Sequence, residues 1–104
     1  MRTERADTIA DGLAVRVPNA EALALMRSSV ERIVTVSEYE IEEAMRIYFS
    51  DAHQVAEGAG AAPLAAALQE HDRFAGRKVG LILSGGNIDR DVYRRILDSP
   101  AKFV

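Results

Sequence analysis

A polar, glycine-rich turn follows an apolar stretch in the C-terminal part of the chain. Residues 79–83 read VGLIL, and the turn Ser-Gly-Gly-Asn occupies residues 84–87. Ligands of α/β folds bind at the carboxyl ends of strands, where the Ser84 hydroxyl could form a hydrogen bond and the glycines would let a flat ring or another backbone approach. The same spacing also suits an ordinary strand-to-helix connection with Asn87 or Asp89 as the helix cap. Spacing alone favours this second interpretation.

Two further turns carry residues that could meet a ligand. Glu57 begins the stretch Glu-Gly-Ala-Gly, which is expected to lead into a helix whose free amides would attract an anion. The Glu57 carboxylate, however, repels anions. Glu57 is therefore either a carboxylate that stabilises the start of the helix or a polar wall residue beside a cationic or protonatable ligand. Chemistry alone favours the first interpretation. In the stretch TIADG (8–12), Asp11 and Gly12 suit either a tight turn or a backbone contact with a ligand.

The remaining reactive residue types form no convincing site. His53 and His71 are separated by a predicted helix and lack acidic neighbours at metal-ligand spacing, so neither a metal site nor a catalytic triad is expected. Lys78 and Lys102 are the only lysines, one at the start of a predicted strand and one in the tail, and neither is an obvious candidate for covalent catalysis. The acidic stretch EYEIEE (38–43) indicates the solvated face of a helix.

Composition excludes several classes of protein. The chain has 104 residues, of which 48% are hydrophobic and 28% charged, as is usual for one globular unit. Its net charge of −3, without basic blocks, argues against nucleic acid or an anionic membrane as a partner. There is no cysteine for a disulfide, a thiolate metal site or a thiol nucleophile, so the cytoplasm is the expected location. We expect no membrane span and no signal peptide.

Four helices are expected to position these turns. A capping box of Ser37 and Glu40, followed by apolar residues at helical spacing, predicts a helix over Glu38–Asp51. Asn19 can cap a shorter helix over about Ala20–Val30, and a last helix is expected over Asp89–Leu97. The alanine-rich helix should begin near Ala61 or Ala62, because Pro63 is tolerated only in a first turn.

Short strands are expected between the helices. The β-branched residues of Ile33–Val36 predict one strand, and Val79–Leu83 predicts another of the kind that is buried on both faces. Residues 1–12 and 72–77 are interpreted as loops. Alternating helices and strands indicate an α/β fold with few short parallel strands and about four helices. So few strands would leave a parallel sheet incomplete.

Four stretches, taken together and in order, resemble one enzyme family. TIADG (8–12), IVTVSEYEIEEAM (33–45), VAEGAGA (55–61) and VGLILSGGNID (79–89) are similar to threonine ammonia-lyases, serine dehydratases and serine racemase. The resemblance covers nearly the whole chain. It implies the C-terminal part of a fold-type-II pyridoxal-phosphate enzyme, as a single unit over residues 1–104 without a regulatory domain.

The resemblance also implies roles for particular residues. Ser84 would form one hydrogen bond with the pyridine nitrogen of the cofactor; because its hydroxyl is neutral, the ring would be a weaker electron sink than one held by a carboxylate, which suits elimination. Asp11 would lie on the substrate side, and no residue of this chain would be catalytic or bind a metal. The other expected cofactor-binding residues are Glu57, Gly12, Gly85, Gly86 and Asn87.

The chain also departs from the family pattern. The family's Schiff-base lysine, phosphate cradle, substrate-carboxylate loop and, in some members, divalent-metal loop all precede the stretch that matches TIADG, and none is found in this sequence. Without that lysine and phosphate site, covalent catalysis by this polypeptide alone is expected to be absent or negligible.

Two hypotheses of different classes follow. The first is a segment of a threonine/serine ammonia-lyase that acts on a hydroxy amino acid and needs a complementary chain for the missing residues. The second is a non-catalytic remnant or interaction module whose exposed sheet edge is covered by self-association or by another chain. The sequence does not choose among threonine, serine and related hydroxy amino acids as substrates.

Overall fold

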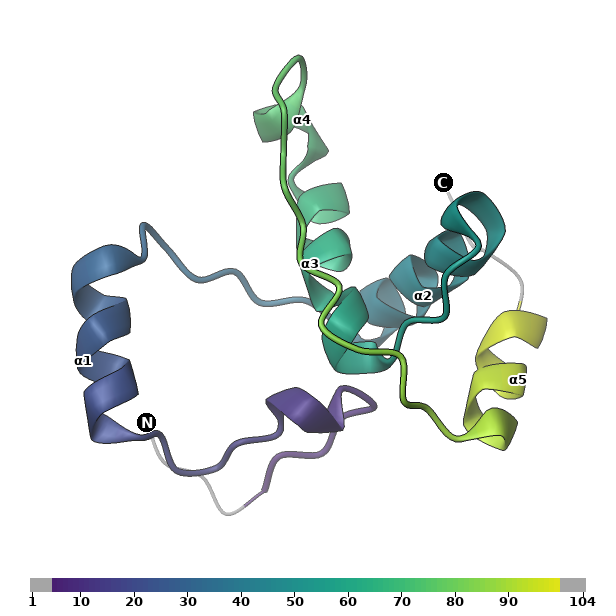
Figure 1. Ribbon diagram of the computed structural model, residues 1–104, viewed down its shortest axis with the longest axis horizontal. Coiled ribbons are helices and arrows are strands. Elements are labelled where there is room, and N and C mark those ends of the chain that lie inside the picture. The colour runs from purple at the N-terminus through teal and green to yellow at the C-terminus, as the bar shows by residue number, and fades with distance from the viewer. Residues whose placement is uncertain (1–4, 100–104) are drawn as a thin grey trace.

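The computed structural model describes residues 5–99, and within that range it is built from helices joined by extended segments (Figure 1). Two long helices, α2 (Glu38–Ala52) and α3 (Gly58–Gln69), cross at the centre of the molecule. The shorter α5 (Arg90–Asp98) packs against α2. The other elements, in chain order, are the 3-10 turn η1 (Asp11–Leu13), α1 (Ala20–Ser29) and α4 (His71–Phe74).

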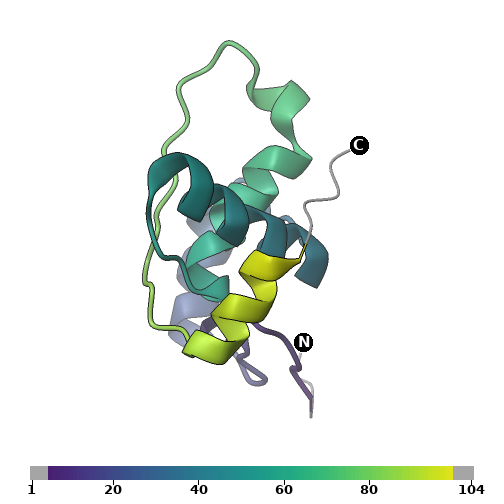
Figure 2. The same cartoon turned by 90° about the vertical axis from the view of Figure 1, so that its right-hand side faces the viewer.

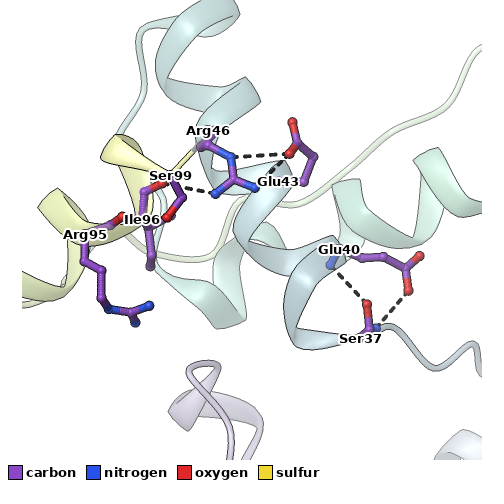
Figure 3. Close-up of polar contacts among 7 residues, drawn as sticks. All are labelled: Ser37, Glu40, Glu43, Arg46, Arg95, Ile96 and Ser99. Atoms are coloured by element: carbon purple, nitrogen blue, oxygen red, sulfur yellow. Dashed lines mark hydrogen bonds and ion pairs between the residues drawn. The ribbon is translucent and has the colours of Figure 1, made fainter. Parts of the chain in front are cut away.

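Local signals place the starts of three helices. The expected capping box at α2 is confirmed: the Glu40 amide donates to Ser37 Oγ at 3.1 Å, and the Ser37 amide donates to Glu40 Oε1 at 2.9 Å (Figure 3). Asn19 Oδ1 accepts from the Ala22 amide at 3.0 Å at the start of α1. Asp89, one of the two expected caps, accepts from the Asp91 amide at the start of α5. The helices predicted at these positions are therefore confirmed.

The core lies where α2 meets α3 and α5 (Figure 2). Small side chains of α3 let the two long helices approach closely, and the longer side chains of Met45 and Ile96 fill the remaining space. The buried apolar residues are Ala10, Ile41, Ala44, Met45, Ala56, Ala61, Ala65 and Ile96. Because Ala10 belongs to the stretch TIADG, this core also holds the segment around η1 against α3.

The predicted parallel strands are not found. Within residues 5–99, Ile33–Val36 and Val79–Leu83 are extended but form no β-ladder. A strand needs a neighbour to accept and donate its main-chain hydrogen bonds, and these two segments do not pair with each other. For the same reason Val79–Leu83 is not buried on both faces, and Ile82 in its middle is 77% exposed.

Two helix boundaries also differ from expectation. α3 begins at Gly58, so Pro63 lies beyond the first turn and the predicted start near Ala61 or Ala62 is wrong. The sequence signal failed because tertiary contacts of Gly58 and Gly60, described below, hold the extra turn in place. Residues 72–74, expected to lie in a loop, belong to the single turn α4 (His71–Phe74), which follows α3 almost without interruption.

α1 lies apart from the other helices, joined to them by extended segments on both sides (Figure 1). It makes no contacts with another helix of the described range, and none of its residues is buried. Its apolar side chains Leu25 and Met26 are exposed. The described part of the first loop expected from the sequence has no helix or strand before η1, and its residues 1–4 lie outside the described range.

Candidate functional site

Three turns that the sequence singled out converge at the N-terminus of α3. The Glu57 amide, just before the helix, donates a hydrogen bond to the Gly85 carbonyl at 3.1 Å. On the other side, Gly58 lies against the backbone of Ile9 and Ala10. TIADG, the turn before α3 and Ser-Gly-Gly-Asn therefore meet at one place, although about 70 residues of sequence separate the first from the last.

Glycines in α3 make this convergence possible. A Cβ at Gly58 would lie 2.8 Å from the Ile9 carbonyl oxygen and 3.0 Å from Ala10 Cα. A Cβ at Gly60 would lie 2.6 Å from the Gly85 carbonyl oxygen. Both positions are helical, so neither glycine is needed for an unusual backbone angle. They are needed because two other backbones press against the first turn of the helix.

The glycines of the other two turns also have close neighbours, a backbone at Gly86 and side chains at Gly85 and Gly12. A Cβ at Gly85 would lie 2.5 Å from Glu57 Oε1, and one at Gly86 would collide with the Val55 carbonyl oxygen. A Cβ at Gly12 would lie 2.9 Å from Ala59 Cβ. Of the two interpretations of Gly85 and Gly86, close approach of another part of the chain is the one found among the described residues.

Ser84 lies beside this junction and faces an open groove. The side chain is exposed, and the groove has a volume of about 500 Å³. Apolar side chains form most of its lining, and Ser84 is the polar residue at its edge. The lining residues are Leu13, Val34, Val36, Ala59, Ala62, Pro63, Ala66, Ile82 and Ser84. A hydroxyl in this setting is free to bond to a ligand.

The other predicted site residues lie around the same junction. The Glu57 side chain is half-buried next to Gly85. Asp11 and Gly12 form the first residues of η1, which packs on α3, and both are exposed. Asn87 is exposed and lies two residues before the cap of α5. Ser84, Glu57, Gly85, Gly86 and Gly12 are therefore brought together.

These residues fit one edge of pyridoxal phosphate. A neutral hydroxyl such as that of Ser84 can bond to a pyridine nitrogen, and the adjacent groove has apolar walls for a ring. The N-terminus of α3 does not suit the phosphate, because the Glu57 carboxylate stands there and would repel it. Lys78 is the only lysine in the described range and is exposed at the start of the extended segment. Among the described residues, the groove beside Ser84 therefore has the chemistry to hold a ring that carries one hydrogen-bonding nitrogen.

The segment TIADG is tied to α2 as well as to α3. Glu38 Oε2 accepts a hydrogen bond from the Ile9 amide at 2.9 Å, and the Ala10 amide donates to Thr8 Oγ1 at 3.1 Å. The first turn of α2 is itself fixed by its capping box. There the amide of Ser37 donates to the Glu40 carboxylate and lowers the pKa of Glu40. α2 thus holds one of the three converging turns.

A buried ion pair that the sequence analysis missed fixes α5. Arg46 Nη2 donates to Glu43 Oε2 at 2.8 Å, and Arg46 Nη1 donates to the Ile96 carbonyl at 3.1 Å, near the C-terminus of α5 (Figure 3). Glu43 and Arg46 are only 6% and 7% exposed, so the interpretation of EYEIEE as a wholly solvated face is wrong for Glu43. Their spacing of three residues on a helix is the signal that could have indicated the pair.

Two aromatic side chains add to the contact between α2 and α5. The rings of Phe49 and Tyr93 meet edge to face, with 6.3 Å between their centres. Burial raises the pKa of Tyr93, and its hydroxyl oxygen has no hydrogen-bond partner in the described part of the chain. Because α5 follows the Ser-Gly-Gly-Asn turn directly, these contacts also limit the movement of that turn.

The histidines do not contribute to the site. His53 is exposed at the C-terminal end of α2, and His71 Nδ1 lies 3.0 Å from the Leu68 carbonyl oxygen. In the part of the chain that the structure describes, no three His, Asp or Glu side chains are close enough to hold a metal ion. No helix of that part is long and apolar enough to cross a membrane.

Comparison with known proteins shows the family of the chain. Residues 1–85 match the model of a family described as pyridoxal-phosphate dependent enzymes. The chain is 41% identical over 97 residues to an L-threonine ammonia-lyase of Thermotoga maritima, which is 93% of this chain and 24% of that protein. It is 38% identical over 84 residues to a beta-hydroxyaspartate dehydratase of Paracoccus denitrificans, which is 81% of this chain and 26% of that protein.

A solved structure shows the same likeness. The crystal structure of a threonine deaminase from T.th. matches with a TM-score of 0.79 and 39% identity, over 86% of this chain and 30% of that one. The described helices and extended segments are thus a part of that fold. The chain spans about a quarter of the length of the curated relatives named above.

Proposed function

The chain belongs to the family of pyridoxal-phosphate dependent enzymes, and on this premise we propose that it is part of an ammonia-lyase for hydroxy amino acids. In this proposal it supplies the side of the site that meets the pyridine nitrogen of the cofactor. The reaction removes water from the substrate and then releases ammonia. The names of the relatives, an L-threonine ammonia-lyase and a beta-hydroxyaspartate dehydratase, support a hydroxy amino acid as the substrate class.

The observation that carries the proposal is the convergence of the three turns beside Ser84. The hydrogen bond from the Glu57 amide to Gly85 fixes the turn that follows Ser84, and the glycine contacts leave that turn little freedom to move. The Ser84 hydroxyl is thereby held at the edge of an apolar groove. Because the loop is already ordered, a ligand that bonds to Ser84 does not have to supply the free energy of ordering it.

The cofactor, when bound, supplies a conjugated ring that delocalises the negative charge left on the substrate when its α-proton is removed. Ser84 forms a hydrogen bond with the ring nitrogen but, being neutral, does not hold a proton there as a carboxylate would. Glu57 closes one wall next to Gly85, and Gly12 and Asp11 bring the backbone of η1 to the opposite side. Gly85, Gly86 and Asn87 shape the edge of the ring site.

The chemistry of proton transfer needs a base that this part of the site does not contain. Within residues 5–99 the one lysine, Lys78, is exposed at the far end of the extended segment from Ser84. A complementary polypeptide segment therefore provides the lysine and the phosphate contacts. The chain without such a segment is inactive in this proposal.

Product formation tests the proposal. The chain is mixed with pyridoxal phosphate and L-threonine, with and without a polypeptide that comprises the part of the Thermotoga maritima relative outside its 97-residue match. We expect 2-oxobutyrate only in the complemented mixture, and much less with Ser84→Ala than with Ser28→Ala, a control on the exposed helix α1. Product from the chain alone, or equal rates for both variants, would show the proposed division of the site to be wrong.

A further inference from the structure

The segment TIADG (8–12) is held from two sides, and the two sets of contacts differ in kind. On the side of α3 the contacts are steric, because Gly58 lies against the backbone of Ile9 and Ala10. On the side of α2 the contact is a hydrogen bond, which the Ile9 amide donates to Glu38 Oε2 at 2.9 Å. Close packing limits how near the segment can come, whereas a hydrogen bond also fixes the direction of the amide. Glu38 therefore orients this backbone.

The turn of α2 that carries Glu38 is itself fixed. Glu38 is the first residue of the helix, and the capping box of Ser37 and Glu40 encloses it (Figure 3). Gln69 Nε2, at the end of α3, donates to the Glu40 carboxylate at 3.0 Å and ties the same turn to the second long helix. A side chain that starts from a fixed turn can hold its partner in one geometry.

The start of α2 does not itself need Glu38. The capping box is complete with Ser37 and Glu40, and Glu38 is exposed, so its removal leaves no cavity. A carboxylate in the first turn of a helix is favoured by the helix dipole, but Glu21 in the first turn of α1 shares that effect. Within residues 5–99, the hydrogen bond to Ile9 is what distinguishes Glu38 from Glu21.

We propose that Glu38 is a positioning residue for the substrate side of the site. The inference rests on the proposed function, in which Asp11 and Gly12 form that side. Glu38 acts through the backbone of Ile9, which lies two residues before Asp11.

Ala10 connects the hydrogen bond at Ile9 to η1. The side chain of Ala10 is 1% exposed and belongs to the core. Its amide donates to Thr8 Oγ1 at 3.1 Å, and its carbonyl accepts from the Leu13 amide at 2.8 Å. Ala10 is thus fixed on both sides in the sequence and does not move independently of Ile9. A change in the direction of the Ile9 amide is therefore transmitted to Asp11, the first residue of η1.

The Ser84 side of the site is held by other contacts. The Glu57 amide donates to the Gly85 carbonyl at 3.1 Å, and Gly86 lies against the Val55 carbonyl. None of these contacts involves Glu38. Loss of the Glu38 carboxylate should therefore affect binding of the substrate and leave the ring-nitrogen contact of Ser84 unchanged.

Kinetics of the complemented mixture test the inference. The chain is combined with the part of the Thermotoga maritima relative outside its 97-residue match, pyridoxal phosphate and L-threonine. We expect Glu38→Ala to raise KM for L-threonine about threefold or more and to change the affinity for pyridoxal phosphate less than about twofold. Glu38→Gln keeps an oxygen that can accept from the Ile9 amide, so it should retain the KM of the unmodified chain. Glu21→Ala, the matched control, should leave both constants unchanged.

Hydrogen exchange of the Ile9 amide is a second readout, which needs neither cofactor nor substrate. In the chain alone we expect this amide to exchange about threefold or more faster in Glu38→Ala than in the unmodified chain. In Glu38→Gln and Glu21→Ala it should exchange at nearly the unmodified rate. Urea unfolding of the same variants identifies a general loss of stability, which would weaken binding of cofactor and substrate together.

Several results would overturn the inference. Equal KM values for Glu38→Ala and the unmodified chain would do so, as would parallel loss of cofactor and substrate binding, which indicates a merely structural role. Glu38→Gln behaving like Glu38→Ala would assign the effect to the charge and not to the hydrogen bond, and unchanged exchange of the Ile9 amide in Glu38→Ala would exclude the contact. Absence of product from the unmodified chain is a different result, which refutes the proposed function, and the inference about the substrate falls with it.

Discussion

Substitution of Gly60 by alanine tests the convergence of the three turns through stability. Glycine to alanine inside a helix ordinarily stabilises it by about 1 kcal/mol, because alanine has the higher helix propensity. At Gly60, however, the new Cβ would lie 2.6 Å from the Gly85 carbonyl oxygen and 3.1 Å from Leu83 Cδ1. Overpacking of a buried site costs about 1–3 kcal/mol, and here the nearest atom belongs to a backbone. After the propensity gain is subtracted, we expect a net loss of up to about 2 kcal/mol.

The assay is urea unfolding followed by far-ultraviolet circular dichroism, with Gly80→Ala as the matched control. A Cβ at Gly80 would meet no atom within 4 Å, so that variant should be neutral or slightly more stable. If the turn containing Gly85 did not press on α3, Gly60→Ala would instead be more stable than the unmodified chain. That outcome would refute the described junction.

Three further changes have expected outcomes. Arg46→Leu leaves Glu43 buried without its partner and should lower the free energy of unfolding by about 3–5 kcal/mol. Adding Glu43→Leu to the same chain should restore much of this stability. Equal stability of the single and double variants in urea unfolding would contradict this expectation. The pKa of Glu40 in the folded chain is below its ordinary value. The contribution of Glu40 to stability is therefore complete above the ordinary glutamate pKa and is lost as pH falls through the lower folded pKa. Glu40→Gln should flatten this part of the pH–stability profile, and an unchanged profile would argue against the capping box. His53 ends α2 at a φ of 55°, a backbone conformation that glycine adopts more easily than histidine. His53→Gly should therefore stabilise the fold by about 0.5–1 kcal/mol and raise the thermal midpoint of unfolding. A lower midpoint would point to an unseen contact of the imidazole.

Helices were predictable where their signals lie within a few residues of each other. The capping box of Ser37 and Glu40 is a local arrangement, and the helix expected over Glu38–Asp51 differs from α2 by one residue at its end. The start of α3 was not predictable in this way. Its first turn depends on contacts of Gly58 and Gly60 with segments far away in the sequence, which no local rule for Pro63 describes.

The strands and the buried ion pair also depend on contacts between distant segments, which local sequence signals do not show. The apolar residues of Val79–Leu83 are typical of a buried strand, but a strand exists only when a neighbour pairs with it, and within residues 5–99 none does. Glu43 was expected in solvent with the other acidic residues of α2. It is buried with Arg46, which also bonds to the Ile96 carbonyl of α5, a contact that no local rule describes. Sequence order suggested that Ser84, Glu57 and Gly12 belong together. Only the structure shows that glycine-to-backbone contacts join their turns.

The central claim, that Ser84 contacts the ring nitrogen of the cofactor, is tested most directly by the affinity for pyridoxal phosphate. The chain complemented with the remaining part of the Thermotoga maritima relative is titrated with the cofactor and followed by absorbance, for the unmodified chain, Ser84→Ala and the control Ser28→Ala. One hydrogen bond contributes about 0.5–1.5 kcal/mol, so we expect Ser84→Ala to weaken binding roughly twofold to thirteenfold and Ser28→Ala to leave it unchanged. Equal affinities of the unmodified chain and Ser84→Ala would contradict the claim.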